Sequence, residues 1–197
     1  GYWNFDQSSG NLTDYSGNGN DLGNTNTTPF VTGKYGNAAD LESGSSHYFK
    51  KEASWLTGWS SRIAITVDNT NIDSDLTNFP LLLTLGTSVG TTNADVSAVF
   101  DELQSDANRK KIAVTKSDGS TQVYVEIEKW DDANEQAWLW VSKSDLTLSG
   151  SADTTLYLYY DSSQSDNTTY VGDPDSTPAE SVWDTNHKGV WHMDEEV

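Results

Sequence analysis

The 197-residue chain contains no cysteine, one methionine and four prolines, and its 11 basic residues are far outnumbered by 30 acidic ones. Without cysteine there is neither a disulfide framework nor thiolate chemistry. The net charge of −19 repels phosphate backbones, so we expect no nucleic-acid partner. No apolar run approaches the roughly 18 residues that a membrane-spanning helix needs, so we expect no membrane insertion.

What the chain does contain falls into segments of different character. Residues 1–54 are rich in Asn and Gly and read as short strands on long turns. A segment with so few large apolar residues cannot bury a core of its own. We therefore expect it to pack against the rest of the chain through Trp3, Phe5, Tyr48 and Phe49.

From Trp59 onward, apolar residues alternate with polar ones at the period of a β-strand. The expected strands include residues 63–67, 79–85, 111–115, 123–128, 136–141 and 156–160. One stretch has helical spacing instead, with Val96, Val99, Phe100 and Leu103 on one face and Asn93 as a candidate N-cap. The prediction is an all-β protein, an antiparallel β-sandwich of the concanavalin A-like or jelly-roll type, with one short helix near residues 94–104 and a polar loop over residues 161–181.

A short motif occurs at both ends of the sequence. Residues 1–7 and 189–195 share a Gly, a Trp two positions later, a large apolar residue two further on, and then Asp. Repetition of one element is typical of modular arrays, and we expect an edge strand in each place. The residues of this assembly strand are Gly1, Tyr2, Trp3, Phe5, Gly189, Val190, Trp191 and Met193.

The motif divides the sequence into a segment 1–54, a domain 55–188 and a terminal strand 189–197. Two interpretations of that last strand stay open. It is either the stub of a following module or a strand donated to a neighbouring molecule. Strand donation would make the protein self-assembling.

Two loops carry oxygen-bearing side chains at alternate positions, the pattern of a calcium loop. The first has Asp14, Ser16, Asn18 and Asn20, with Gly19 at the sixth place but Thr25 where a closing Glu is expected. The second has Asn71, Asp73 and Asp75 after Asn69, without either the glycine or the Glu. Calcium is the one candidate cofactor, and turn formation by Asn, Asp and Gly is the alternative for both loops.

Other candidate residues favour structural roles. Glu126 and Glu128 share a strand face, as paired catalytic carboxylates do in retaining glycosidases, but no second catalytic segment accompanies them. We expect a solvated strand face and no enzyme activity. Trp138 and Trp140 are expected to pack on the sheet or in the core. His47, His187 and His192 lack the mutual spacing of metal ligands.

Two family resemblances are present. Residues 1–49, with Tyr2-Trp3-x-Phe5-Asp6 and Gly33-Lys34-x-Gly36-Asn37, resemble the opening of a laminin-G-like, concanavalin A-like lectin module. Residues 59–193 resemble a bacterial domain family of unknown function that accompanies such modules in large surface proteins. The residues that carry this second resemblance are Trp59-x-x-Arg62, Leu76-Thr77-Asn78-Phe79-Pro80, Glu126-Ile127-Glu128-x-Trp130-Asp131, Trp138-x-Trp140-Val141, Tyr157-x-Tyr159-Tyr160 and Val190-Trp191-His192.

These resemblances imply a fold and a context, that of large modular surface proteins. Our first hypothesis is therefore a non-catalytic, exported surface module for adhesion or glycan recognition within a larger modular protein. Its partners would be glycans or neighbouring protein modules, and its location extracellular, on a cell or virion surface. The alternative is a structural subunit of an extracellular filament or phage tail fibre that assembles by strand exchange.

Overall fold

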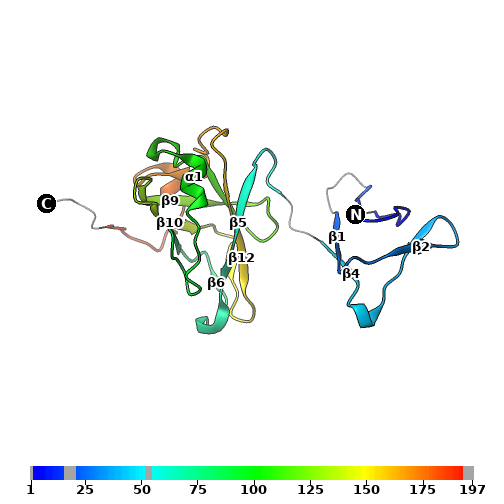
Figure 1. Ribbon diagram of the computed structural model, residues 1–197. Helices are drawn as coiled ribbons and strands as arrows, with labels where there is room; N and C mark the ends of the chain where they lie inside the picture. Colours follow the sequence, from blue (N-terminus) through cyan, green and yellow to red (C-terminus); the bar gives the residue numbers. More distant parts are fainter. Residues whose placement is uncertain (1, 16–20, 52–54, 193–197) are drawn as a thin grey trace. The chain divides into compact units, whose positions relative to one another are not determined.

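The computed structural model describes residues 2–15, 21–51 and 55–192. The protein divides into two compact units, Gly1–Ser54 (unit 1) and Trp55–Val197 (unit 2), shown in Figure 1. In the parts of the sequence that the structure describes, no helix has the length and apolarity needed to cross a membrane. The prediction that residues 1–54 pack on the second unit stays a prediction.

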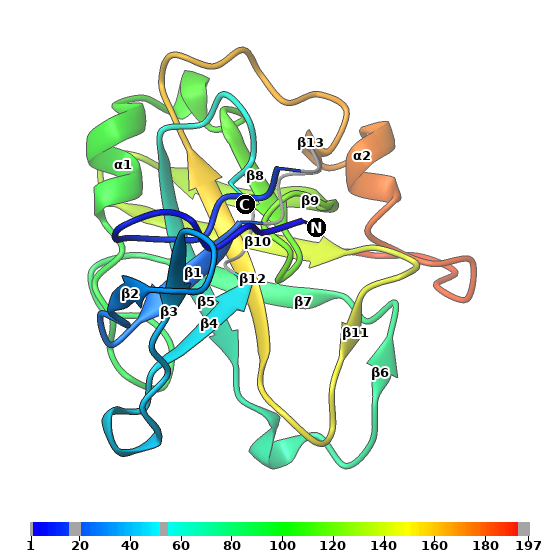
Figure 2. The ribbon, with the colours of Figure 1, turned by 90° about the vertical axis from the view of Figure 1, so that its right-hand side faces the viewer.

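Unit 1 consists of short strands joined by long turns. β1 (Leu22–Thr25) pairs with β4 (Tyr48–Lys51), and β2 (Phe30–Thr32) pairs with β3 (Asn37–Ala39), each antiparallel (Figure 2). A 3-10 turn, η1 (Ser43–Ser45), precedes β4. The Phe49 ring lies 6.0 Å from that of Phe5 and 5.9 Å from that of Phe30, so these three phenylalanines form a small cluster within the unit.

The edge strands expected at the two copies of the motif do not form among the residues of this chain that the structure describes, and a strand donated to a neighbouring molecule stays a prediction. Residues 2–7 and 189–192 form no strand. Phe5 has a φ of 59°, in the left-handed region, which interrupts an extended backbone. Beside it the Asn4 side-chain oxygen accepts a hydrogen bond from the Asp6 N–H at 3.2 Å, an Asx turn that competes with strand pairing.

Unit 2 is built on one large curled antiparallel sheet. Its order is β5–β12–β8–β9–β10–β7, and β13 (Val171–Gly172) adds a short parallel pairing to β9. All six strands that the alternation predicts are confirmed, as β5 (Ser61–Val67), β7 (Leu81–Leu85), β8 (Ile112–Thr115), β9 (Gln122–Asp131), β10 (Gln136–Ser142) and β12 (Thr154–Tyr160). A separate two-stranded ladder joins β6 (Leu76–Thr77) to β11 (Thr147–Leu148).

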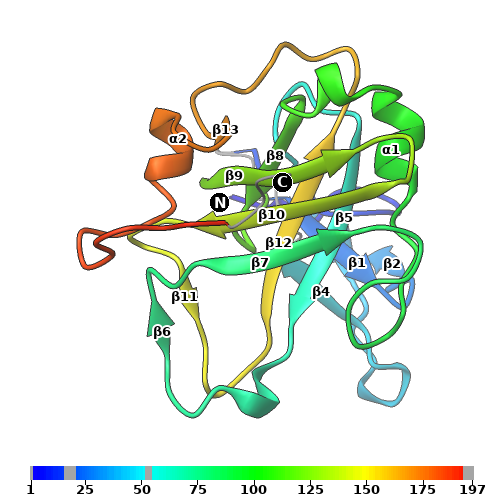
Figure 3. The same cartoon turned by 90° about the vertical axis from the view of Figure 1, so that its left-hand side faces the viewer.

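The sheet has two arms, β9–β10–β7 and β5–β12. It curls because the apolar faces of these two arms must cover one another. Figure 3 shows β9, β10 and β7 side by side, with β12 and β5 crossing behind them. Between the arms lies the core, which includes Val125, Ile127, Leu139, Val141, Leu156 and Leu158, each no more than 3% exposed. The fold is therefore all-β, as predicted, whereas a jelly-roll sandwich is not confirmed.

Two short helices accompany the sheet. α1 (Ala98–Leu103) buries Val99, Phe100 and Leu103, so the predicted helix is confirmed but is shorter than residues 94–104. Asn93 is not its N-cap, because Asn93 has a φ of 54° in the turn that joins Val89 to Ala94. The second helix, α2 (Thr177–Glu180), and β13 both lie in the stretch 161–181, which the sequence predicted to be a loop.

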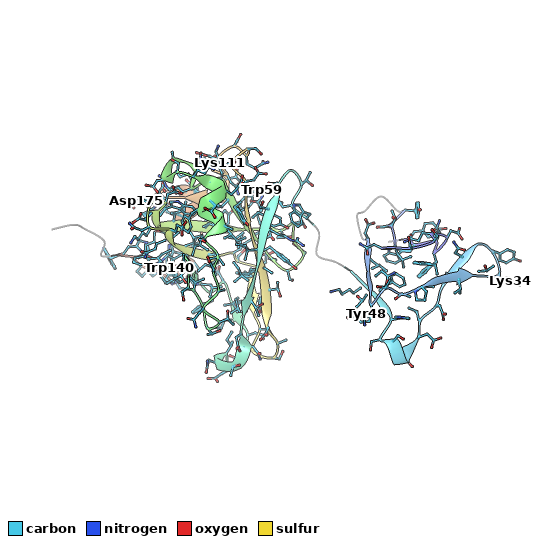
Figure 4. All side chains as sticks on the ribbon, in the orientation of Figure 1. Lys34, Tyr48, Trp59, Lys111, Trp140 and Asp175 are labelled. Atoms are coloured by element: carbon cyan, nitrogen blue, oxygen red, sulfur yellow. The ribbon has the colours of Figure 1, made fainter. Side chains whose placement is uncertain are left out.

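Aromatic rings surround the first strand of unit 2. The Arg62 guanidinium lies 4.3 Å from the centre of the Trp55 ring and 4.2 Å from that of Tyr157, and its Nη1 donates to the Tyr159 hydroxyl at 2.9 Å. Tyr159 is fully buried and donates in turn to the Gly119 carbonyl at 2.8 Å. Trp59, labelled in Figure 4, completes the group with its ring 6.3 Å from that of Tyr159. Cation–π stacking and buried hydrogen bonds thus hold the backbone where unit 2 begins.

Candidate functional site

The site with the densest polar chemistry lies on the outer face of β9 and β10, away from the core. Val125 and Ile127 point into the core opposite Val141 and Leu139, so Glu126 between them points outward, opposite Trp140. The register then shifts, and Lys129, rather than Glu128, stands opposite Trp138. This β-bulge inserts Glu128 as an extra residue, and bulges of this kind re-aim side chains.

Glu126 is buried on that outer face, with only 3% of the residue exposed. One carboxylate oxygen accepts a hydrogen bond from the Trp183 indole N–H, and the other lies 2.7 Å from His192 Nε2. The prediction of a solvated strand face is therefore wrong for Glu126. The segment that follows α2 covers it, and alternation within β9 cannot reveal such a cover.

His192 bridges the two glutamates. Its Nε2 faces Glu126, and its Nδ1 lies 3.6 Å from a Glu128 oxygen that also accepts the Trp140 indole N–H at 2.5 Å. The His192 side chain is 11% exposed and that of Glu128 15%. The Nε2 atom is within hydrogen-bond distance of Glu126, whereas the separation between Nδ1 and Glu128 is a longer contact.

Trp183 lies in the middle of a group of aromatic rings beside Glu126 and Glu128. Its ring centre lies 5.3 Å from those of Trp140 and His187 and 6.2 Å from that of His192. His187 Nδ1 lies 2.9 Å from the Asp184 carboxylate, and hydrogen bonds from Asn186 and His187 lower the pKa of Asp184. Trp140, labelled in Figure 4, therefore packs on the sheet as predicted. We call the set Glu126, Glu128, Trp140, Trp183 and His192 the carboxylate–tryptophan cluster.

The same face also carries an open part. Trp138 is 41% exposed and Leu82, on the neighbouring strand β7, is also 41% exposed. The Lys129 ammonium lies 4.8 Å from the centre of the Trp138 ring. Trp138 stands opposite Thr84, and Trp140 stands opposite Leu82. Trp138, Leu82 and Lys129 thus form an exposed patch beside the buried cluster, and we call it the Trp138 patch.

The carboxylates of the carboxylate–tryptophan cluster are already engaged by other side chains of the protein. A retaining glycosidase needs two carboxylates that flank an open substrate position, whereas His192 lies between Glu126 and Glu128 and both carboxylates accept indole N–H groups. Nor do the ligands converge on one point, because each carboxylate faces a different nitrogen of the ring. Among the described residues no group of three or more His, Asp and Glu side chains could hold a metal ion.

The structure describes only some of the residues in the two predicted calcium loops. Ser16, Asn18 and Asn20 lie outside the described residues. Asp14 is 7% exposed, and its carboxylate accepts the Tyr2 N–H at 2.8 Å. In the second loop Asn71 belongs to the 3-10 turn η2 (Asn69–Asn71), and Asp75 accepts the Gly150 N–H at 2.9 Å. Asp73 is exposed. The structure thus gives Asp14 and Asp75 structural roles, and calcium binding stays a prediction.

The motif residues differ between the two copies. Trp3 is half-buried in unit 1, while Trp191 is 79% and Val190 37% exposed. Gly189 lies against the Trp191 ring, where a Cβ would stand 2.3 Å from a ring carbon. Gly1 and Met193 lie outside the described residues.

The contacts of Trp183 and His192 with Glu126 were not predicted from the sequence. The sequence feature that could have indicated a polar cluster here is the pair of acidic residues on a sheet face that also carries two Trp residues.

Comparisons of this protein with protein-family models, with curated proteins and with solved structures find no match.

Proposed function

We propose that the protein is a non-catalytic surface module that recognises glycans, and that it works as one unit of a larger exported protein. The observation that carries this proposal is the Trp138 patch. A half-exposed indole on a rigid strand offers an apolar face on which a sugar ring can stack. Lys129, whose ammonium lies 4.8 Å from the centre of the Trp138 ring, supplies a polar group that can orient a ligand.

The absence of catalysis is part of the same proposal. Its support is the engagement of Glu126 and Glu128 by indole N–H groups and by His192. The finer fold assignment, a concanavalin A-like jelly roll, also belongs here, and it is supported by the resemblance of residues 1–49 and 59–193 to lectin-associated modules. We expect purified protein to lack glycosidase activity, and Glu128→Gln to leave sugar binding unchanged.

A glycan array followed by calorimetry tests the proposal. We expect a glycan that the wild-type protein binds to lose at least about tenfold in affinity to Trp138→Ala, which corresponds to about 1.4 kcal/mol. Phe79→Ala is the control, because Phe79 is an exposed aromatic residue, 45% accessible, that lies outside the patch. A protein that binds no glycan, or binds equally well without Trp138, would contradict the proposal.

A second candidate function, a filament subunit, is favoured by one observation, the exposure of Trp191. A large indole without cover is what a donated segment would present to an acceptor. Light scattering and negative-stain microscopy separate the two functions, since a binding module stays monomeric and a filament subunit forms polymers that Trp191→Ala dissolves. Deletion of residues 189–197 is a poorer test, because it also removes His192 from the carboxylate–tryptophan cluster.

A further inference from the structure

A cavity of about 550 Å³ opens between the two end strands of the curled sheet, β5 and β7. Within the described residues, β5 pairs only with β12 and β7 only with β10, so their outer edges face this opening. Apolar side chains line the cavity, including Ile63, Ile65, Leu81, Leu83, Val96 and Leu158. The volume falls within the range of about 300–1,000 Å³ that is typical of small-molecule sites.

The cavity is an open part of the core rather than a surface irregularity. Ile63 and Ile65 stand opposite the fully buried Leu158 and Leu156, yet both are only partly buried. The loop with Val89, Gly90, Thr91 and Thr92 forms another part of the wall. Side chains that face an empty cavity lack the dispersion contacts that a close-packed interior provides. An apolar molecule in the cavity would supply those contacts.

Two carboxylates also line this cavity. Asp68, directly after β5, accepts hydrogen bonds from the Thr70 hydroxyl and from the Thr70 N–H, the latter at 2.7 Å, and these lower the pKa of Asp68. Asp153 accepts the Asn69 N–H at 3.1 Å through Oδ1. Among the described residues neither carboxylate forms an ion pair, and neither Oδ2 has a hydrogen-bond partner. The cavity thus combines an apolar lining with two exposed carboxylates at its edge, which form no ion pair among the described residues.

We propose that this cavity binds a small amphiphile with an apolar body and a cationic head group. The apolar body would fill the space beside Ile63 and Ile65, and the head group would lie against Asp68 and Asp153. An anionic amphiphile of the same length would meet two like charges, on a protein whose net charge is −19. This site is separate from the Trp138 patch, since neither Trp138 nor Lys129 lines it.

Displacement of a neutral apolar dye tests the proposal. N-phenyl-1-naphthylamine would be bound to the 197-residue protein and displaced by decyltrimethylammonium or by decanoate, each below its critical micelle concentration. We expect the ammonium compound to displace the dye at an about tenfold lower concentration. The double variant D68N/D153N should abolish that preference while still binding the dye, and high salt should weaken the preference in the wild-type protein.

A second variant locates the dye. Ile65→Phe should fill the cavity and lower dye binding at least about tenfold. Gln136→Phe, which adds the same ring at an exposed position on β10 outside the cavity, should leave dye binding unchanged. Circular dichroism confirms that both variants are folded. Dye binding that survives Ile65→Phe, or equal displacement by the two amphiphiles, would overturn the proposal, and an apolar peptide segment as the natural occupant would give the second result.

Discussion

At the scale of single residues, the buried charges of unit 2 are held by specific donors. Glu126 faces an indole N–H and an imidazole nitrogen, and Asp161 accepts the Ser60 N–H at 3.0 Å and the Ser163 N–H at 2.9 Å. A buried carboxylate without such partners would cost several kcal/mol. The donors around each carboxylate therefore matter more to stability than the exposed ion pairs of the surface.

Replacing Glu126 tests this point. Glu126→Ala removes the partner of both Trp183 and His192, and we expect the free energy of unfolding to fall by about 2–4 kcal/mol. Glu126→Gln keeps an oxygen acceptor and should cost less. Urea denaturation measures both effects, with Glu180→Gln as an exposed control expected to change stability by less than about 0.5 kcal/mol. Unchanged unfolding in Glu126→Ala would mean that Glu126 is not held as described.

Asp161 predicts a dependence of stability on pH. The Ser163 hydroxyl, with further hydrogen bonds from Ser60 and from the Ser163 N–H, lowers the pKa of Asp161 to about 2, compared with about 3.9 in an unfolded polypeptide. Because the folded pKa is the lower one, Asp161 stabilises the fold above about pH 4, and this contribution is lost as the pH falls towards 2. We expect Asp161→Asn to flatten the loss of stability over that interval, measured by thermal unfolding at a series of pH values. Parallel curves for the two proteins would contradict the assignment.

At the scale of elements, the bulge in β9 decides what the outer face contains. Strict alternation would place Glu128 and Trp130 together on that face, but the shift between Trp138 and Leu139 returns Trp130 to the core side, where its ring lies 5.1 Å from that of Phe100. The segment after α2 then completes the face with Trp183 and His192. A strand, its bulge and a distant covering segment thus act together.

Two neighbouring residues of that segment should behave differently. His192→Ala leaves Glu126 and Glu128 without the imidazole between them, and we expect it to lower the free energy of unfolding by about 1–3 kcal/mol. Trp191→Ala serves as the matched control, because Trp191 is 79% exposed and its removal should change stability by less than about 0.5 kcal/mol. Chemical denaturation measures both. Equal effects at the two positions would show that the segment contributes by packing in general and not through His192.

How well the sequence predicts these elements depends on how far apart in the sequence the interacting residues lie. The strands of unit 2 follow from alternation, which is local, as in Val123, Val125 and Ile127. The burial of Glu126 could not be predicted, because its cover comes from Trp183 and His192, 57 and 66 residues further along the sequence. The extended conformation expected at Phe5 also failed, since an Asx turn at Asn4 is as compatible with that sequence as a strand.

At the scale of the whole molecule, the two units differ in their cores. In the described parts of unit 1, residues 2–15 and 21–51, Leu12 is the one large apolar residue that is fully buried, while Tyr2, Tyr15, Tyr35, Leu41 and Tyr48 are exposed. Unit 2 contains a continuous core of Leu, Val and Ile side chains. Unit 1 therefore has little apolar burial with which to offset the entropy of ordering its turns.

We accordingly expect a peptide of residues 1–54 to remain unfolded by itself, whereas residues 55–197 fold. Two-dimensional NMR spectra of the two fragments measure this, and the expected result is narrow amide dispersion for the first and wide dispersion for the second. The fragment 55–197 is also the internal control for expression and handling. A cooperatively folded 1–54 peptide would contradict the expectation and would make unit 1 an independent domain.

The pairing of β5 with β12 has a consequence for how the protein folds as it is made. Arg62 and Tyr159, which meet across this pair, are 97 residues apart in the sequence. At a translation rate of about 5–20 residues per second, β5 waits about 5–20 s for its partner strand. Contacts so distant in sequence slow folding through the entropy of loop closure. During that interval β5 lacks the strand with which it pairs, so the position of β12 late in the sequence sets how long the apolar residues of β5 stay unpaired in the nascent polypeptide.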